Sequence, residues 1–175
     1  LESQDPVRDF DMIAFTIGYE MSYSNVVNML RLSQVPIYSR DRQGLRNLVF
    51  AGGVCAFNPE PLADFVDFFS LGEGEESTVE IVSLYQKAKR EDWTKDRFLE
   101  AVSHIPGVYV PSFYTHTYRP DGTLAAITPR EGAPKVVTKR IVEDLDRAYF
   151  PTKTIVPTTE IVHDRSNLEV FRGCI

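Results

Sequence analysis

Short apolar runs alternate with stretches of helical periodicity in the first half of the chain. The runs Asp11 to Ile17, Asn47 to Ala51 and Phe65 to Leu71 are apolar without strict alternation, which is typical of strands buried on both faces of a sheet. Helical spacing and helix-start residues predict helices after Ser22, after Asn58, after Glu76 and from Lys95 to His104.

This alternation of strand and helix predicts an α/β fold. The order strand–helix–strand favours a parallel sheet with right-handed crossovers. We expect a partial doubly wound, Rossmann-like parallel sheet, followed by a β-rich connector. In sheets of this kind, ligands bind at the carboxyl ends of the strands.

The second half of the chain is extended. Pro120-Asp121-Gly122 separates Tyr109 to Tyr118 from Leu124 to Ile127, which predicts a β-hairpin. Because the chain starts without Met and stops just after a predicted strand, we expect a fragment of a longer protein. The expected parts are an α/β domain at 1–104, a β-hairpin appendage at 105–149, a proline-punctuated linker at 150–165 and the start of a further domain at 166–175.

Composition narrows the classes of function. The chain has 175 residues, a net charge of -6 and a pI near 5.1, which argues against a general nucleic-acid binder with a basic face. No apolar run is long enough to cross a bilayer, and no signal peptide opens the chain. We therefore expect a cytoplasmic protein that does not bind membranes.

Glycine-containing loops follow the predicted strands and are the first candidates for ligand binding. They are Gly18-Tyr19, Gly52-Gly53-Val54 and Gly72-Glu73-Gly74-Glu75. Glycine lets a ligand approach the backbone, and amides at a helix start can hold a polar group. The acids of the last loop disfavour phosphate and suit hydroxyl or amide donors. The alternative for Gly52-Gly53 is a plain tight turn. The alternative for the last loop is a helix N-terminus whose acids complement the helix dipole.

Histidine and cysteine positions give no complete catalytic or metal-binding group. We expect His104 at a helix end, His116 facing solvent in the hairpin and His163 in a structural role. Cys55 either lines the crevice at the strand ends or is a small buried side chain. Cys174, taken alone, is a free thiol. Spacing alone assembles no four-ligand metal site and no nucleophile–base pair.

Taken together, the motifs resemble those of radical S-adenosylmethionine proteins with an N-terminal cobalamin-binding domain. The shared order is an apolar strand ending in Gly52-Gly53, then Pro59-Glu60, a second apolar strand, and Gly72-Glu73-Gly74-Glu75. The segments 151–157 and 160–165, with Phe171-Arg172-Gly173-Cys174, resemble the approach to the catalytic barrel in one uncharacterised subfamily.

The resemblance implies the cofactors of a longer parent protein. Cys174 would be the first ligand of a [4Fe–4S] cluster in a Cys-x-x-x-Cys-x-x-Cys motif, with S-adenosylmethionine on the iron left free. Residues 166–175 would then begin the barrel, and the glycine loops would belong to a cobalamin-binding-like domain. Cobalamin itself stays open, because Val102 replaces the aspartate of the Asp-x-His-x-x-Gly motif that ligates cobalt. We expect no bound cofactor in this fragment.

Two functions compete for the fragment, and neither makes it catalytic by itself. It is either a cofactor-binding module of a radical enzyme or a scaffold that keeps the cobalamin-binding fold without cobalamin. A third alternative is a free-standing α/β binding protein. The expected partner is the parent's own barrel, and RNA or protein stays open as its substrate. A truncated parallel sheet would expose an apolar edge, which predicts a homo-oligomer.

Overall fold

The computed structural model describes residues 4–153, 156, 159–162 and 169–173. The chain divides into two compact units, Leu1–Ile141 and Val142–Ile175. The first unit contains all the strands and α-helices of the described part. In the second, the described residues form a single 3-10 turn, Leu145–Arg147, in which the Asp144 side chain accepts a hydrogen bond from the Asp146 amide.

The first unit is a mixed α/β structure built on a four-stranded sheet with the order β1-β2-β3-β4. The strands β1, β2 and β3 are parallel, as the sequence predicts, and β4 is antiparallel to β3. The central strand β2 is buried on both faces, which explains its continuous apolar run. The strand bounds are Met12–Thr16, Leu48–Gly52, Phe68–Ser70 and Val108–Tyr109.

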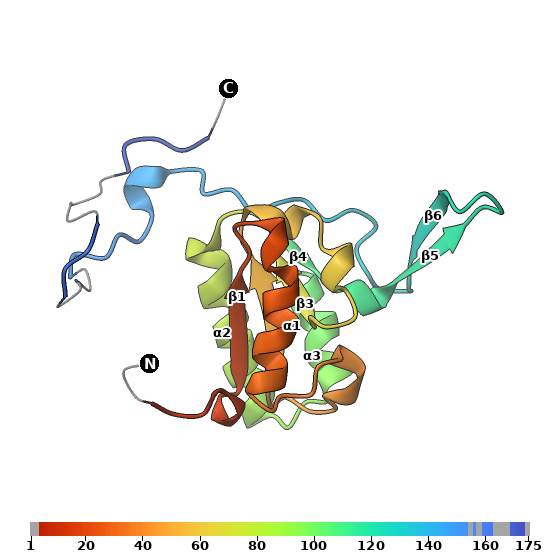
Figure 1. Cartoon of the computed structure of the whole chain (residues 1–175). Coiled ribbons are helices and arrows are strands. Elements are labelled where there is room, and N and C mark those ends of the chain that lie inside the picture. Colours follow the sequence, from red (N-terminus) through yellow and green to blue (C-terminus); the bar gives the residue numbers. More distant parts are fainter. Residues whose placement is uncertain (1–3, 154–155, 157–158, 163–168, 174–175) are drawn as a thin grey trace. The chain divides into compact units, whose positions relative to one another are not determined.

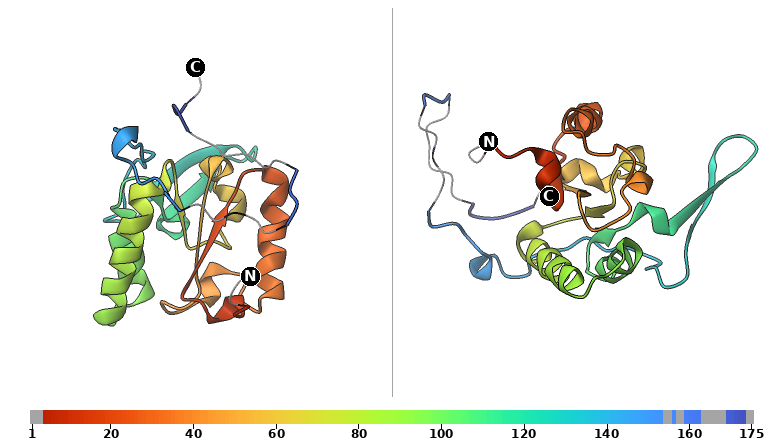
Figure 2. Two further views of the ribbon diagram at one scale, coloured as in Figure 1. Left: turned by 90° about the vertical axis from the view of Figure 1, so that its left-hand side faces the viewer. Right: turned by 90° about the horizontal axis from the view of Figure 1, so that it is seen from below.

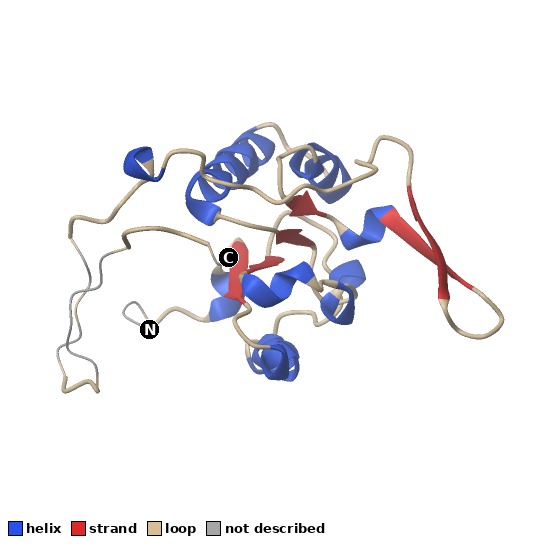
Figure 3. Cartoon of the chain, turned by 90° about the horizontal axis from the view of Figure 1, so that it is seen from above, coloured by secondary structure: helices blue, strands red, loops and turns tan. Residues whose placement is uncertain are grey.

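Helices cover both faces of this sheet (Figure 3). The helix α1, Tyr23–Leu32, packs on one face with buried Val26 and Leu30. The helices α2, Gly74–Arg90, and α3, Lys95–Ser103, pack side by side on the other face, as both views of Figure 2 show. Acidic residues in the first turn of α2 and basic residues in its last turn complement the helix dipole.

Two predicted elements are wrong. The helix expected after Asn58 is only a 3-10 turn, Glu60–Leu62. The hairpin strand expected from Tyr109 begins later, since Val108–Tyr109 joins the main sheet as β4 and Pro111 opens a 3-10 turn after it.

A separate two-stranded hairpin follows β4 and extends away from the sheet (Figure 1). Its strands β5, Tyr114–Tyr118, and β6, Leu124–Pro129, confirm the predicted hairpin. At the turn, the Asp121 carboxylate accepts hydrogen bonds from the Thr123 amide and hydroxyl, at 2.9 and 2.7 Å. Most residues of both strands are exposed, so packing on the rest of the unit depends on the hairpin base.

The strand β1 lies at one end of the sheet and has no second neighbour among the described residues. An open edge of this kind is a template for pairing with another chain. The oligomer expected from the sequence therefore stays a prediction. Light scattering of the purified chain should give at least the mass of a dimer, and a monomeric mass at working concentration would contradict it.

Candidate functional site

The carboxyl ends of β1 and β2 are joined directly by backbone contacts. The Ile17 amide donates to the Gly52 carbonyl at 2.7 Å, and the Cys55 amide donates to the Ile17 carbonyl at 3.0 Å. Gly53 has a φ of +95°, and a Cβ there would lie 2.7 Å from the Ile17 oxygen. The close approach that needs Gly53 is therefore made by the neighbouring strand end of the same chain.

The Gly72-Glu73-Gly74-Glu75 loop is likewise in contact with a later segment of the chain. The Glu73 amide donates to the Arg140 carbonyl at 3.0 Å, and the Arg140 amide donates to the Leu71 carbonyl at 2.9 Å. Gly72 has a φ of +98°, and a Cβ there would lie 2.2 Å from the Arg140 oxygen. Residues 138–141, named the strap here, thus add a short parallel bridge beside β3 (Figure 1).

The strap is held by side-chain ion pairs in addition to its backbone hydrogen bonds. The Arg140 guanidinium bonds to the carboxylates of Glu76 and Glu80 on α2, the second at 2.9 Å. Gly107, with a φ of +89°, lies on the other side, where a Cβ would be 3.0 Å from the Arg140 amide nitrogen. The Arg140 side chain is 19% exposed, so these ion pairs are partly shielded from water.

The other predicted loop residues lie along the same edge but build no enclosed site. Gly18 has open space around it, and Gly74 is the first residue of α2. Glu73 is the N-cap residue of α2, and Glu75 lies in its first turn. Large apolar side chains from the loops after β1 and β2 are exposed at this edge: Tyr19, Met21, Val54 and Phe57.

Cys55 lies behind this edge and is half-buried against the α1 face of the core. Its carbonyl accepts a hydrogen bond from the Tyr23 hydroxyl at 3.0 Å. Burial raises the pKa of the Cys55 thiol, and the Glu20 carboxylate raises it further. A thiol held in its neutral form is a poor nucleophile and a poor metal ligand, so the structure favours the packing role.

The three histidines are placed apart from one another. His104 ends α3, as the sequence predicts. His116 is not solvent-facing, because its side chain is 20% exposed and turns toward Glu60. His163 and Cys174 lie outside the described residues. Within the described part of the chain, no group of three or more His, Cys, Asp or Glu side chains could hold a metal ion.

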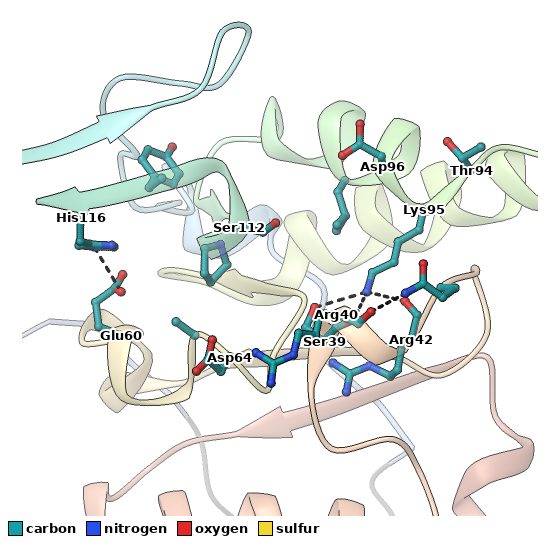
Figure 4. A pocket seen from close by; sticks show the side chains of 15 residues that line it. Ser39, Arg40, Arg42, Glu60, Asp64, Thr94, Lys95, Asp96, Ser112 and His116 are labelled. Atoms are coloured by element: carbon teal, nitrogen blue, oxygen red, sulfur yellow. Dashed lines mark hydrogen bonds and ion pairs between the residues drawn. The ribbon is translucent and has the colours of Figure 1, made fainter.

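A cavity of about 680 Å³ lies away from the predicted loops, beside the amino ends of β2 and β3 (Figure 4). Its walls come from the loop after α1, the 3-10 turn at Glu60, the start of α3, and the chain from Pro111 into β5. Its polar lining consists of Ser39, Arg40, Arg42, Gln43, Glu60, Asp64, Thr94, Lys95, Asp96, Ser112, Tyr114 and His116.

One end of the cavity rests on a buried charge cluster around Asp67. The side chains of Asp67 and Arg42 are 0% and 1% exposed and are joined at 3.0 Å, and the Lys95 ammonium lies 2.6 Å from the other Asp67 oxygen. The Arg42 guanidinium also donates to three backbone carbonyls. Asp67 accepts from the Val49 amide at 2.7 Å and from the Ser39 hydroxyl. The cluster fixes the loop after α1 against the sheet.

The opposite end of the cavity is lined by Glu60 and His116, and Tyr109 bonds to Glu60. The Tyr109 hydroxyl donates to one Glu60 oxygen at 2.5 Å, and His116 Nε2 lies 3.3 Å from the other. Burial, and then the hydrogen bond to Glu60, raise the pKa of Tyr109, so this phenol remains a donor. His116 Nε2 is buried and lacks a well-aligned hydrogen bond within the described residues.

Sequence reasoning missed this cavity because its walls come from segments far apart along the chain. Pro59-Glu60 is the one local signal, and its composition predicts the start of a helix. The spacing of Glu60 and His116 carries no periodicity that would bring them together.

Comparison with known proteins agrees with the strand and loop motifs. Residues 1–111 match the model for the N-terminal region of radical SAM proteins. The chain belongs to the radical SAM proteins. This membership implies S-adenosylmethionine and a [4Fe–4S] cluster in the parent protein, while the described residues contain no group that would bind the cluster.

One curated relative carries the name of an uncharacterized protein. It is the protein MJ0966 of Methanocaldococcus jannaschii, which is 36% identical over 81 residues. That alignment covers 45% of this chain and 16% of the relative, so the chain spans a small part of the longer protein. No solved structure matches significantly. None of the described helices combines the length and apolar character needed to cross a membrane.

Proposed function

We propose that this chain is the N-terminal scaffold of a radical SAM iron–sulfur enzyme and that it does not bind cobalamin. The observation that carries this proposal is the strap on the Gly72 loop. The strap lies at the carboxyl edge of the sheet, where a cofactor of a Rossmann-like domain would bind.

The contacts of the loop support a scaffold over a cobalamin module. The Glu73 amide is already bonded to the Arg140 carbonyl, and the space beside Gly72 is filled by Arg140 backbone. The space beside Gly53 is filled by Ile17 backbone in the same way. The glycines that the resemblance assigns to a cobalamin-binding-like domain therefore serve close packing within the chain, and the residues present do not fit the cofactor at these loops.

The iron–sulfur part of the proposal rests on Cys174. By resemblance, this thiolate is the first of three cluster ligands, the others being supplied by the longer protein. The cluster, when bound, supplies the electron that cleaves S-adenosylmethionine reductively. The described residues of this chain take no part in that step, and their contribution is to fold the domain that precedes the cluster motif.

The exposed apolar side chains at the carboxyl edge are the surface on which the catalytic barrel of the same protein docks. Tyr19, Met21, Val54 and Phe57 come from two neighbouring loops and are all largely exposed. The strap brings the polypeptide to this edge just before the first unit ends at Ile141. Burial of this apolar area would stabilise the contact, and the barrel that follows in the sequence is the partner that we propose.

The test uses the full-length protein, purified and reconstituted with iron and sulfide without oxygen. We expect Cys174→Ala to lose the cluster absorbance and the cleavage of S-adenosylmethionine, and the matched variant Cys55→Ala to keep both. Titration with hydroxocobalamin should leave the corrinoid spectrum unchanged. A saturable spectral change or a co-purified corrinoid would contradict the scaffold role, and an intact cluster in Cys174→Ala would contradict the iron–sulfur assignment.

A further inference from the structure

The cavity at the amino ends of β2 and β3 is lined by charges of both signs that the scaffold role leaves unused. Figure 4 shows Glu60 and His116 at one end, Arg40 beside Asp64 between the ends, and Arg42 and Lys95 at the other end, where Asp96 also lies. Its volume of about 680 Å³ falls within the range of small-molecule sites. Separated charges of both signs suit a ligand that also carries both signs.

At the end with Glu60 and His116, two polar atoms face one another without a proper hydrogen bond. Glu60 Oε2 and His116 Nε2 are 3.3 Å apart, yet the geometry leaves the buried Nε2 unsatisfied. Tyr109 already donates to Glu60 Oε1, so Oε2 is the oxygen that faces the cavity. A neutral imidazole has one donor and one acceptor nitrogen, so the Nδ1–H tautomer of His116 would offer Nε2 as an acceptor beside that carboxylate oxygen. A primary ammonium, with three N–H donors, satisfies both acceptors.

The three basic side chains of the cavity differ in how many hydrogen-bond and ion-pair partners they have within the chain. Arg42 and Lys95 are committed to Asp67 and to backbone carbonyls. Arg40 instead stacks over the Tyr38 ring at 4.3 Å, and its guanidinium forms no hydrogen bond or ion pair within the described part of the chain. A guanidinium that lies over an aromatic ring keeps its N–H groups available for a carboxylate.

The start of α3 adds to the positive potential at the end with Arg42 and Lys95. Thr94, Lys95 and Asp96 line the cavity at the first turn of this nine-residue helix. The Thr94 hydroxyl caps the Arg97 amide at 3.3 Å. Asp96 is paired with Arg130 at 2.9 Å, so its charge is partly offset. The helix dipole therefore favours an anionic group within this cavity.

We propose that this cavity binds a small zwitterion, with its primary ammonium at Glu60 and His116 and its carboxylate at Arg40. Free amino acids and short peptides share this chemistry, and both fit a cavity of this size. The site is independent of the scaffold role, because none of its residues belongs to the carboxyl edge or to the strap.

The test is a titration of the ¹⁵N-labelled chain, followed by NMR, with separate sets of free amino acids and of unblocked di- and tripeptides. We expect saturable shifts of the amide signals of Arg40, Glu60 and His116 with at least one set, and the set with higher affinity identifies the source. Glu60→Gln and Arg40→Ala should each weaken binding by about tenfold or more, since each removes a charged hydrogen-bond partner.

The controls separate loss of binding from loss of folding. Arg90→Ala, on the exposed last turn of α2 and outside the cavity, should bind as the unchanged chain does. Circular dichroism should show that every variant is folded. N-acetylated and C-amidated peptides should bind at least about tenfold more weakly, because each lacks one of the two charges. Absence of saturable shifts with either set, or equal binding of blocked peptides, would overturn the proposal.

Discussion

Substitution of Gly72 by alanine should release the strap and lower the free energy of unfolding by about 2–4 kcal/mol. A non-glycine residue at a φ of +98° is strained, and the new Cβ would lie 2.2 Å from the Arg140 oxygen. Relief of that clash requires breaking the bonds from the Glu73 amide and from the Arg140 amide. Urea unfolding followed by circular dichroism measures the loss, and hydrogen exchange at these two amides locates it.

Gly74→Ala is the matched control within the same motif. Gly74 has ordinary helical geometry, and a Cβ there would lie 3.4 Å from Thr78 Oγ1, an ordinary contact. Its unfolding free energy should stay within about 1 kcal/mol of the unchanged chain, since alanine is the better helix former. Equal losses in the two variants would mean that the strap is not what requires glycine at Gly72.

Substitution of Asp67 by asparagine should be the most destabilising conservative change, with a loss of about 3–5 kcal/mol. Asparagine keeps the shape of the side chain but leaves the buried Arg42 guanidinium without a counter-charge. Lys95, whose side chain is 12% exposed, loses the same partner at 2.6 Å. The measurement is again urea unfolding, with the slope of the transition used to check that the unfolding stays two-state.

Asp11→Asn provides the control for a carboxylate of the same type at the surface. The Asp11–Lys89 pair is 2.9 Å long, but both side chains are about half exposed. Water screens such a pair, so the expected loss is below about 1 kcal/mol. If the two asparagine variants lost the same stability, burial would not be what makes the Asp67 cluster important.

The fold could be predicted from sequence where periodicity and burial act locally. The runs Asp11 to Ile17 and Asn47 to Ala51 form β1 and β2 nearly residue for residue. Burial on both faces explains the continuous apolar run of β2, whereas β1 lies at the edge of the sheet and exposes Ala14 and Thr16. The segment after Asn58 forms only a 3-10 turn, although it carries the residues of a helix start. Val108 and Tyr109 have no local signal for their partner, since pairing with β3 depends on the path of the intervening helices.

The position of the glycine loops could also be predicted, but what they contact could not. The sequence predicts that Gly72 opens the backbone to a ligand, but Arg140, which lies 68 positions later in the chain, occupies that place. No periodicity in the sequence indicates contacts between residues so far apart in the chain. The same holds for Glu60 and His116, which meet only because the hairpin base packs on a turn between β2 and β3.

The strap also determines where an expressed fragment of this protein can end. The part matched by the family ends at residue 111, yet the sheet edge of that part is completed by Arg140. A gene fragment that stops at residue 111 would omit the backbone that bonds to Leu71 and Glu73, and would leave two acids of α2, Glu76 and Glu80, without their cation. The region matched by the family and the compact folding unit therefore have different C-terminal boundaries. An expressed fragment should end after Ile141.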